Sequence, residues 1–432
     1  MALINQPRVW STIFATQKDR RSFVEACLER SHPAPLDVTV DAGENARARP
    51  GCTCDKDGRK RLLPNEVNPC EWHFQFESLA KPKHSSRIRT LDIDLDGEWT
   101  PVAKTERFAL GSCRFFALSF PKLTTLGWKD EETDYANFLF FTPPFPPTLR
   151  SLTYVGAWST FIAPVNNLTS FVFEGDCGLE GTNLEVVRSF LSNNRSLESL
   201  EFNYVDFEGD PKGPPVHLPN LKSLSVGITY KGLWAIIRVP ALGRLSSLHI
   251  SLQQDACVYT LRATGDEITF SARCFARELG ETWEDLAGHA KPVIHHIRLE
   301  DGPVVDDCGD YIAFRPLLSD VRTLEIGNGY FPLWYRGFLH DLKQLGPQLK
   351  VIRFAISEDL EPFRGDGEYE LFGGFFLDQI EELVRFRFEQ GRPFSVVERM
   401  RIGGSERANR QRDYVWRCFY GSHKLGRYVQ PV

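Results

Sequence analysis

A short apolar phrase returns eleven times along this 432-residue chain and limits the folds open to it. Its first, fourth and sixth residues are apolar, and we number them repeat positions 1, 4 and 6. Four copies are nearly identical: LRSLTY from Leu149, LESLEF from Leu197, LKSLSV from Leu221 and LSSLHI from Leu245. Weaker copies begin at Ile88, Leu123, Leu168, Ile294, Val321, Leu349 and Val397. Because alternate side chains of an extended segment share a face, positions 4 and 6 are predicted to point together into a core.

The spacing of the copies indicates a stacked repeat. Successive copies are 35, 26, 19, 29, 24, 24, 49, 27, 28 and 48 residues apart. Most of these steps scatter around the roughly 20–29 residues of leucine-rich repeats. The two long steps indicate degenerate repeats or insertions, near the hairpin-like TLRATGDEITFSAR and near FRGDGEYELFGG. One repeat cannot bury its apolar face alone, so stacked neighbours are expected to form a parallel sheet over a continuous core.

Helical returns are predicted between the strands. Apolar residues recur at helical spacing over residues 184–191, over residues 275–286, and at Phe376, Ile380, Leu383 and Val384. A β-sandwich, the alternative, would show turns every ~8–12 residues and no helical returns. We therefore predict an irregular, right-handed α/β leucine-rich-repeat solenoid over residues 84–432. It would be a horseshoe with short parallel strands on its concave face and helices on its convex face, preceded by an N-terminal cap.

Composition narrows the class of protein. The formal net charge is −6 and the pI is about 6.0, which argues against a dedicated nucleic-acid binder. The N-terminus lacks a signal-peptide pattern, and no apolar run reaches the ~20 residues of a membrane helix. Ten cysteines spread over a long chain are expected to be free thiols. We predict a cytoplasmic or nuclear protein; the basic run KDGRKR is a solvated loop or a weak nuclear signal.

The first 45 residues resemble a known family. Pro7, Trp10 and Ile13, with Val9, look like the end of an F-box, and the segments LERS from Leu28 and APLDV from Ala34 follow it. With the repeats, this lead-in resembles the F-box/leucine-rich-repeat proteins of mushroom-forming fungi. The resemblance implies substrate selection for an SCF-type ubiquitin ligase, with an F-box that docks on the ligase's linker subunit. Here the docking half of the F-box is missing, so the alternative is a stand-alone interaction scaffold.

The resemblance also sets the expected domain boundaries. Residues 1–45 would hold the vestigial F-box end and a helical cap. Residues 46–83 would form a polar, basic loop or insertion, and the solenoid would follow. The linker subunit is an expected partner if the F-box is completed upstream.

Two residue groups have the composition of metal sites. Asp92, Asp94, Asp96 and Gly97 match the first half of a calcium-binding loop, but Ala103 stands where a bidentate Glu is required, so no calcium site is predicted. Cys52, Cys54, Cys70 and His73 could hold zinc or belong to a thiol-containing surface loop.

The sequence favours recognition over catalysis. His295 and His296 are adjacent, so in a strand they face opposite sides and cannot form one ligand pair. The chain holds no nucleophile elbow, phosphate-binding loop or zinc-protease motif. We expect a monomeric, non-enzymatic protein without cofactors, which binds neither nucleic acid nor membrane.

The outward strand positions 5 and 7 are the candidate binding surface for a protein substrate of unknown identity. Their charge is −3 over the first five copies and +1 over the last four, which predicts a partner of complementary polarity. The partner-binding candidates are Asp92, Asp94, Lys129, Glu174, Glu201, Asn203, His249, Arg298, Arg353 and Arg401.

Overall fold

The structure is a computed structural model of the chain and divides it into two compact units, Met1–Val205 and Asp206–Val432. The described residues are 6–16, 21–41, 78–79, 81–94, 120–129, 145–156, 158, 165–175, 182–205, 207–209, 213–228, 236, 240–252, 258–260, 267–269, 293–300, 318–326, 342–343, 346–355, 380–400, 417 and 425–429.

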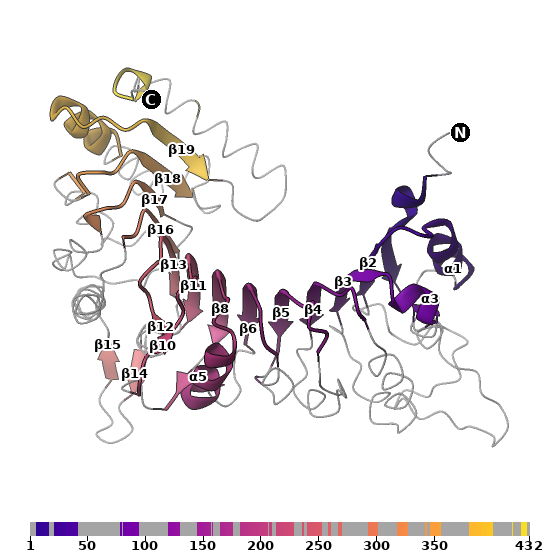
Figure 1. Cartoon of the computed structure of the whole chain (residues 1–432). Helices are drawn as coiled ribbons and strands as arrows, with labels where there is room; N and C mark the ends of the chain where they lie inside the picture. Colours follow the sequence, from indigo (N-terminus) through magenta and orange to yellow (C-terminus); the bar gives the residue numbers. More distant parts are fainter. Residues whose placement is uncertain are drawn as a thin grey trace. The chain divides into compact units, whose positions relative to one another are not determined.

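Thirteen strands form a parallel sheet whose strand order follows chain order (Figure 1). The first unit contributes β1 (Thr12–Thr16), β2 (Leu36–Asp41), β3 (Ile88–Asp94), β4 (Thr125–Lys129), β5 (Ser151–Val155), β6 (Ser170–Glu174) and β8 (Ser199–Val205). The second contributes β11 (Ser223–Ile228), β13 (Ser247–Leu252), β16 (His296–Glu300), β17 (Thr323–Ile326), β18 (Val351–Ala355) and β19 (Val396–Met400). The predicted α/β, solenoid-like parallel stack is confirmed.

The repeated phrase builds the core as predicted. In β5, Leu152 and Tyr154 at positions 4 and 6 are fully buried, and Leu149 at position 1 is buried just before the strand. Neighbouring strands align position 4 with position 4, so that Leu152 pairs with Leu126 on one side and Phe171 on the other. In this register, apolar side chains at the same repeat position lie next to one another in the core. Their burial removes apolar surface from water, which stabilises the fold.

A tight turn precedes most strands. The position-1 N–H donates to the carbonyl three residues earlier, as in Leu245 to Leu242 at 3.0 Å and Leu221 to Leu218 at 3.3 Å. The residue three before position 1 is itself buried in several repeats, including Phe120, Leu242 and Leu318. The repeat therefore includes one more buried apolar residue on its N-terminal side than the six-residue phrase predicted.

Two of the predicted helices lie in the described part of the chain. Helix α5 (Leu184–Asn193) begins where the Oδ1 atom of Asn183 accepts the Glu185 N–H at 2.8 Å, and Phe190 packs on Phe171 of β6 with 4.5 Å between ring centroids. Residues 380–389 are helical, with Ile380, Leu383 and Val384 buried. Both predictions are confirmed, whereas Phe376 and residues 275–286 lie outside the described residues.

The remaining described elements are short. The helices are η2 (Pro7–Trp10), α1 (Arg21–Arg30), α3 (Pro82–Ser85) and η7 (Leu425–Arg427). The short strands are β7 (Thr182–Asn183), β9 (Phe207–Glu208), β10 (Val216–His217), β12 (Pro240–Ala241), β14 (Val258–Thr260) and β15 (Glu267–Thr269). β14 and β15 pair antiparallel, which confirms the hairpin-like insertion in the long step after Leu245. Among the described residues, no helix is long and apolar enough to cross a membrane.

The sheet begins earlier than the predicted boundary at residue 84. Ile13 on β1 pairs with Val38 on β2, and Val38 pairs with Leu91 on β3. Trp10, Ile13 and Ala15 carry the apolar phrase in a weak form, which explains why β1 joins the stack. Residues 12–41 are therefore not a separate helical cap but two strands with α1 between them. Of the predicted loop, the structure describes only residues 78–79 and 81–83.

The last repeat begins at Phe394 and not at Val397. Val397 pairs with Ile352, a position-4 residue, and Glu398 pairs with Arg353, a position-5 residue. Phe394 is fully buried, as position 1 requires. The prediction of Arg401 as a position-5 side chain was therefore wrong by three residues, and Arg401 itself lies outside the described residues.

Candidate partner-binding face

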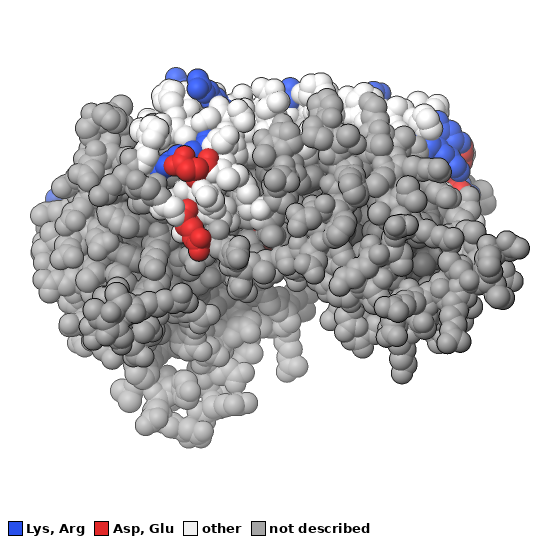
Figure 2. Space-filling model, turned by 90° about the horizontal axis from the view of Figure 1, so that it is seen from below, with Lys and Arg blue, Asp and Glu red and all other residues white. Residues whose placement is uncertain are grey.

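The side chains at repeat positions 3, 5 and 7 lie on the face of the sheet opposite the apolar core, and we call this the outward face. The burial pattern of β5 and β6 alternates between buried core positions and half-exposed outward positions. On the side seen in Figure 2, the charged side chains of the described residues form small separated groups, without one continuous patch.

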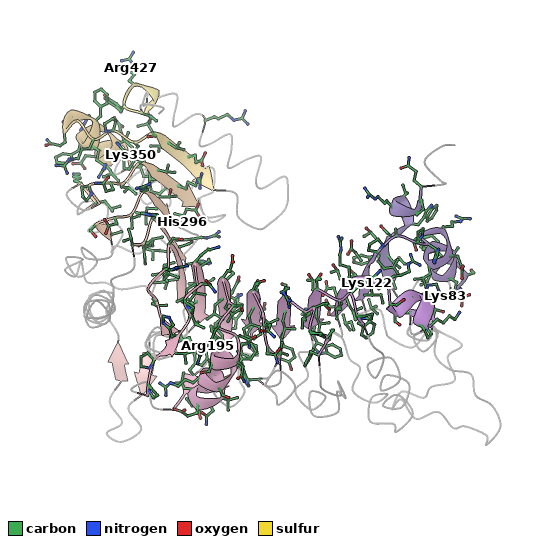
Figure 3. The ribbon with its side chains drawn as sticks, viewed as in Figure 1. Lys83, Lys122, Arg195, His296, Lys350 and Arg427 are labelled. Atoms are coloured by element: carbon green, nitrogen blue, oxygen red, sulfur yellow. The ribbon has the colours of Figure 1, made fainter. Side chains whose placement is uncertain are left out.

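Glu325 is the centre of a charge network on the outward face of the second unit. Its Oε1 atom accepts a hydrogen bond from Nη1 of Arg353 at 2.8 Å, and Nε of Arg353 donates to Glu398. The three residues are register partners on β17, β18 and β19. On the other side, Nε2 of His296 on β16 lies 3.4 Å from Oε2 of Glu325; Figure 3 labels His296 on its strand. Four adjacent strands thus contribute one polar or charged side chain each to this network.

The electrostatics of Glu325 follow from these neighbours. Only 8% of the residue is exposed, and burial alone would raise the pKa of its carboxyl group. The His296 imidazole first, and then the Arg353 guanidinium, overcome that effect and hold the pKa of Glu325 at about 2. Glu325 and Glu398 in turn raise the pKa of Arg353. The Glu325 carboxyl group is therefore ionised and the Arg353 guanidinium protonated at neutral pH.

Two serine–histidine pairs lie on the same outward face, and we call these pairs and the charge network together the polar row. Oγ of Ser247 lies 3.1 Å from Nδ1 of His296, and Oγ of Ser225 lies 2.9 Å from Nδ1 of His249. Both pairs join register partners of neighbouring strands. Each serine is thereby held in one orientation across the strand boundary.

Ser247, His296 and Glu325 have the composition of a nucleophile, base and acid relay. However, the carboxylate of Glu325 is also engaged by Arg353, whose charge offsets the negative charge that would stabilise an imidazolium. The arrangement therefore fits a rigid polar network better than a reacting centre.

Asp92 defines the outward face of the first unit. Its Oδ1 atom lies over Gly127 of the next strand, where a Cβ atom would come within 2.1 Å of it, so a larger residue at position 127 would require the Asp92 carboxylate to move. Desolvation, and after it the charge of Asp94, raises the pKa of Asp92. On β8, Nδ2 of Asn203 donates to Oε1 of Glu201 at 2.8 Å.

The structure brings most of the predicted partner-binding residues to the outward face. Those on the sheet strands are Asp92 and Asp94 on β3, Lys129 on β4, Glu174 on β6, Glu201 and Asn203 on β8, His249 on β13, Arg298 on β16 and Arg353 on β18. Arg353 belongs to the charge network, and Glu201 and Asn203 form a pair.

The corrected register changes the charge of the outward face. With Glu398 in place of Arg401 at position 5, the last four repeats carry −1 at positions 5 and 7, and not the predicted +1. The first five repeats carry −3 at the same positions. The predicted drift from acidic to basic was therefore wrong, because Glu398 and not Arg401 stands at position 5 of the last repeat and removes the excess of positive charge.

Position-3 residues were missed as functional candidates. Ser247 and His296 both occupy position 3 and lie in the polar row. Because side chains alternate with a period of two, position 3 shares the outward face with position 5. The same alternation that identified positions 5 and 7 would have identified them.

The residues resembling an F-box end lie at the first edge of the sheet. Pro7 and Trp10 form the 3-10 helix η2, and the guanidinium of Arg30 lies 4.8 Å from the Trp10 ring centre. Ile13 is buried on β1. The following LERS segment is held by buried Arg87, whose side chain donates to the Leu28 carbonyl and to Oγ of Ser31.

Most of the residues considered as possible metal ligands lie outside the described part of the chain. Cys52, Cys54, Cys70, His73, Asp96 and Gly97 lie outside the described residues. Within the described ranges, no group of three or more His, Cys, Asp or Glu side chains could hold a metal ion. Cys27 is buried and is not part of a disulfide.

Compared with known proteins, the chain matches no family model and no curated protein.

Proposed function

We propose that the chain is a leucine-rich-repeat protein that binds another protein on the outward face of its sheet and catalyses no reaction. The observation that carries this proposal is the cross-strand network of His296, Glu325, Arg353 and Glu398. Polar and charged side chains held in one geometry on a sheet face need little further ordering when a partner binds. The repeat spacing and the parallel stack support the leucine-rich-repeat assignment.

The acidic outward faces indicate the chemistry of the partner. Charges arranged in opposition steer association and select among partners. A basic surface on the partner would complement both units. By the resemblance of the first 45 residues, that partner would be a substrate of an SCF-type ubiquitin ligase; the alternative is an interaction scaffold without a ligase.

Recovery of partners from the protein's own cells tests this proposal. Tagged wild-type chain is compared with the triple variant Asp92→Lys, Asp94→Lys and Glu201→Lys by quantitative mass spectrometry of co-purifying proteins. A control variant makes the same change in charge at Glu185, Glu208 and Glu389, which lie outside the thirteen-stranded sheet. We expect a partner that is retained by the wild type and the control and lost by the triple variant.

The captured partner is then purified for a direct titration. Reversal of three charges is expected to weaken affinity at least about tenfold, as loss of about 1.4 kcal/mol would. An affinity unchanged in the triple variant overturns the outward-face proposal. Co-purification of the ligase's linker and cullin subunits supports the ligase arm, and their absence with the partner present favours the scaffold.

A further inference from the structure

A second charged surface lies at the N-terminal ends of the sheet strands, directly before each strand begins. Residues at repeat position 2 follow one another along these strand ends, and we call those of the second unit the entry row. It consists of Lys222, Ser246, His295, Arg322, Lys350 and Ser395. The row is separate from the outward face, so an inference about it does not rest on the proposed function.

Backbone hydrogen bonds hold the entry row in place. The Lys350 N–H donates to the Arg322 carbonyl at 2.9 Å, and the Arg322 N–H donates to the His295 carbonyl at 2.8 Å. Each of these carbonyls also accepts the next N–H of the neighbouring strand, from Val351 and Thr323 respectively. The Cα atoms of Arg322 and Lys350 are therefore held directly before the adjacent strands β17 and β18, and adjacent strands lie about 4.8 Å apart.

The entry row places two cations side by side without a counter-charge. Arg322 and Lys350 are both exposed, and within the described part of the chain neither has an ion-pair partner. Arg392, in the turn before β19, is a third exposed cation. Among the described residues of the turns before β17, β18 and β19, Asp320 is the only acidic one. Its Oδ2 atom accepts a hydrogen bond from Oγ of Ser319 at 3.0 Å. Like charges in neighbouring strands repel, so an anion placed against them would relieve that repulsion.

The first unit shows the opposite arrangement at the same repeat position. Arg89 is paired with Asp37, with 2.7 Å between Nη2 and Oδ2. Arg150 donates to the carbonyls of Pro147 and Leu149. Threonines precede and follow Arg150 in this row. Position 2 therefore does not require unpaired cations, and their grouping is particular to the second unit.

We propose that the entry row of the second unit binds an acidic peptide segment of a protein partner through Arg322 and Lys350, together with Arg392 in the turn before β19. A guanidinium binds a carboxylate with two parallel hydrogen bonds, and an ammonium adds a point charge beside it. Clusters of arginine and lysine are a recurring means of recognising acidic motifs. Nucleic-acid binding draws on many phosphate contacts, commonly about 6–10, and three cations on a chain of net charge −6 suit a short acidic segment better.

Titration with a defined peptide tests the proposal. The probe is a fluorescein-labelled peptide of consecutive glutamates, and binding to the full chain is followed by fluorescence anisotropy at two salt concentrations. The double variant Arg322→Glu, Lys350→Glu should bind at least about tenfold more weakly, as loss of about 1.4 kcal/mol would. The control Lys122→Glu, Arg150→Glu makes the same change in net charge in the first unit and should stay within about twofold of the wild type.

Three outcomes overturn the proposal. The first is equal binding by the entry-row variant and the wild type. The second is equal weakening by the control, which would mean that only net charge matters. The third is tighter binding of a single-stranded oligonucleotide of matched charge, lost in the same variant, which would assign the row to nucleic acid.

Thermal stability of a milder variant tests the proposal even if the charge-reversal variant misfolds. The milder variant Arg322→Ala, Lys350→Ala should keep its fold and melt at or slightly above the wild-type temperature, because a repulsion is removed. Added glutamate peptide should raise the melting temperature of the wild type and leave that of this variant unchanged. An equal shift in both proteins would contradict the proposal independently of the titration.

Discussion

Asn194 is a buried polar side chain on which two repeats depend. Its Oδ1 atom accepts the Leu168 N–H at 3.1 Å, and its Nδ2 donates to the carbonyls of Val165 and Phe190, each at 2.9 Å. In the turns before Leu123, Leu149 and Leu197, for example, the position-1 N–H donates directly to the carbonyl three residues earlier. Here the Asn194 amide bonds both of those groups, Leu168 N–H and Val165 carbonyl, and also ties them to the end of α5.

Removal of this amide should be strongly destabilising. We expect Asn194→Ala to lower the free energy of unfolding by about 3 kcal/mol, because it leaves buried backbone groups without partners. Asn193→Ala, one residue earlier and exposed, should change it by less than about 0.5 kcal/mol. Urea denaturation of both variants measures the difference, and equal stabilities would contradict this role of Asn194.

Glu325 predicts an acid-sensitive contribution to stability. Its pKa is about 2 in the folded chain against an ordinary value of 4.5, so the folded state favours the ionised form. The contribution is fully present above pH 4.5 and is lost as the pH falls towards 2. It amounts to at most about 3.5 kcal/mol, since one pKa unit corresponds to about 1.4 kcal/mol.

The variant Glu325→Gln isolates this contribution. The wild type should exceed the variant in unfolding free energy by a constant amount above pH 5, and the gap should shrink between pH 4.5 and 2. Glu389→Gln, an exposed carboxyl at the end of a helix, is the control. A gap that does not change with pH would show that the carboxyl has an ordinary pKa.

At the scale of elements, β19 shows why a repeat can be placed wrongly from its letters. VERMRI has apolar residues at its first, fourth and sixth places, but a match at only three positions can occur by chance. In the observed register the sixth place holds Arg399, which breaks the phrase. Pairing with β18 decides the register, because only that alignment puts Phe394 and Val397 in the core and Glu398 beside Arg353.

The register of β19 can be tested by truncating Phe394. If it occupies position 1, Phe394→Ala should cost about 3–5 kcal/mol of stability through lost burial and a cavity. Arg392→Ala, exposed in the preceding turn, should cost less than about 0.5 kcal/mol. Denaturant unfolding of the two variants gives the comparison. A small effect at Phe394 would return the start of the repeat to Val397.

At the scale of the whole molecule, parallel strands in chain order mean that each repeat contacts mainly its neighbours. Stability should then be the sum of repeat terms and nearest-neighbour terms. Leu152 and Phe171 are register partners on β5 and β6, whereas Leu91 on β3 is three strands, about 14 Å, from Phe171.

A double-mutant cycle measures this locality. Alanine substitutions at Leu152 and Phe171 should couple by at least about 0.5 kcal/mol, and those at Leu91 and Phe171 should add within about 0.5 kcal/mol. The free energies come from urea unfolding of the single and double variants. Strong coupling over three strands would instead indicate a core that responds as one unit.

The sequence by itself determined the repeat, which of its apolar residues are buried, and the parallel order of the strands. Position 1, 4 and 6 side chains such as Leu221, Leu224 and Val226 are buried as predicted, because the two-residue period of a strand and the need to cover each repeat with the next leave one solution. The same alternation placed Asp92, Glu201 and Arg353 on the outward face.

Only the tertiary structure decided which of these side chains act together. His296 and Glu325 are 29 residues apart, and their 3.4 Å contact exists because β16 and β17 align in one register. Cross-strand distances depend on registers set by many core contacts at once, which local patterns do not encode. For the same reason β1 and β2 joined the sheet despite weak phrases, and the last repeat began at Phe394.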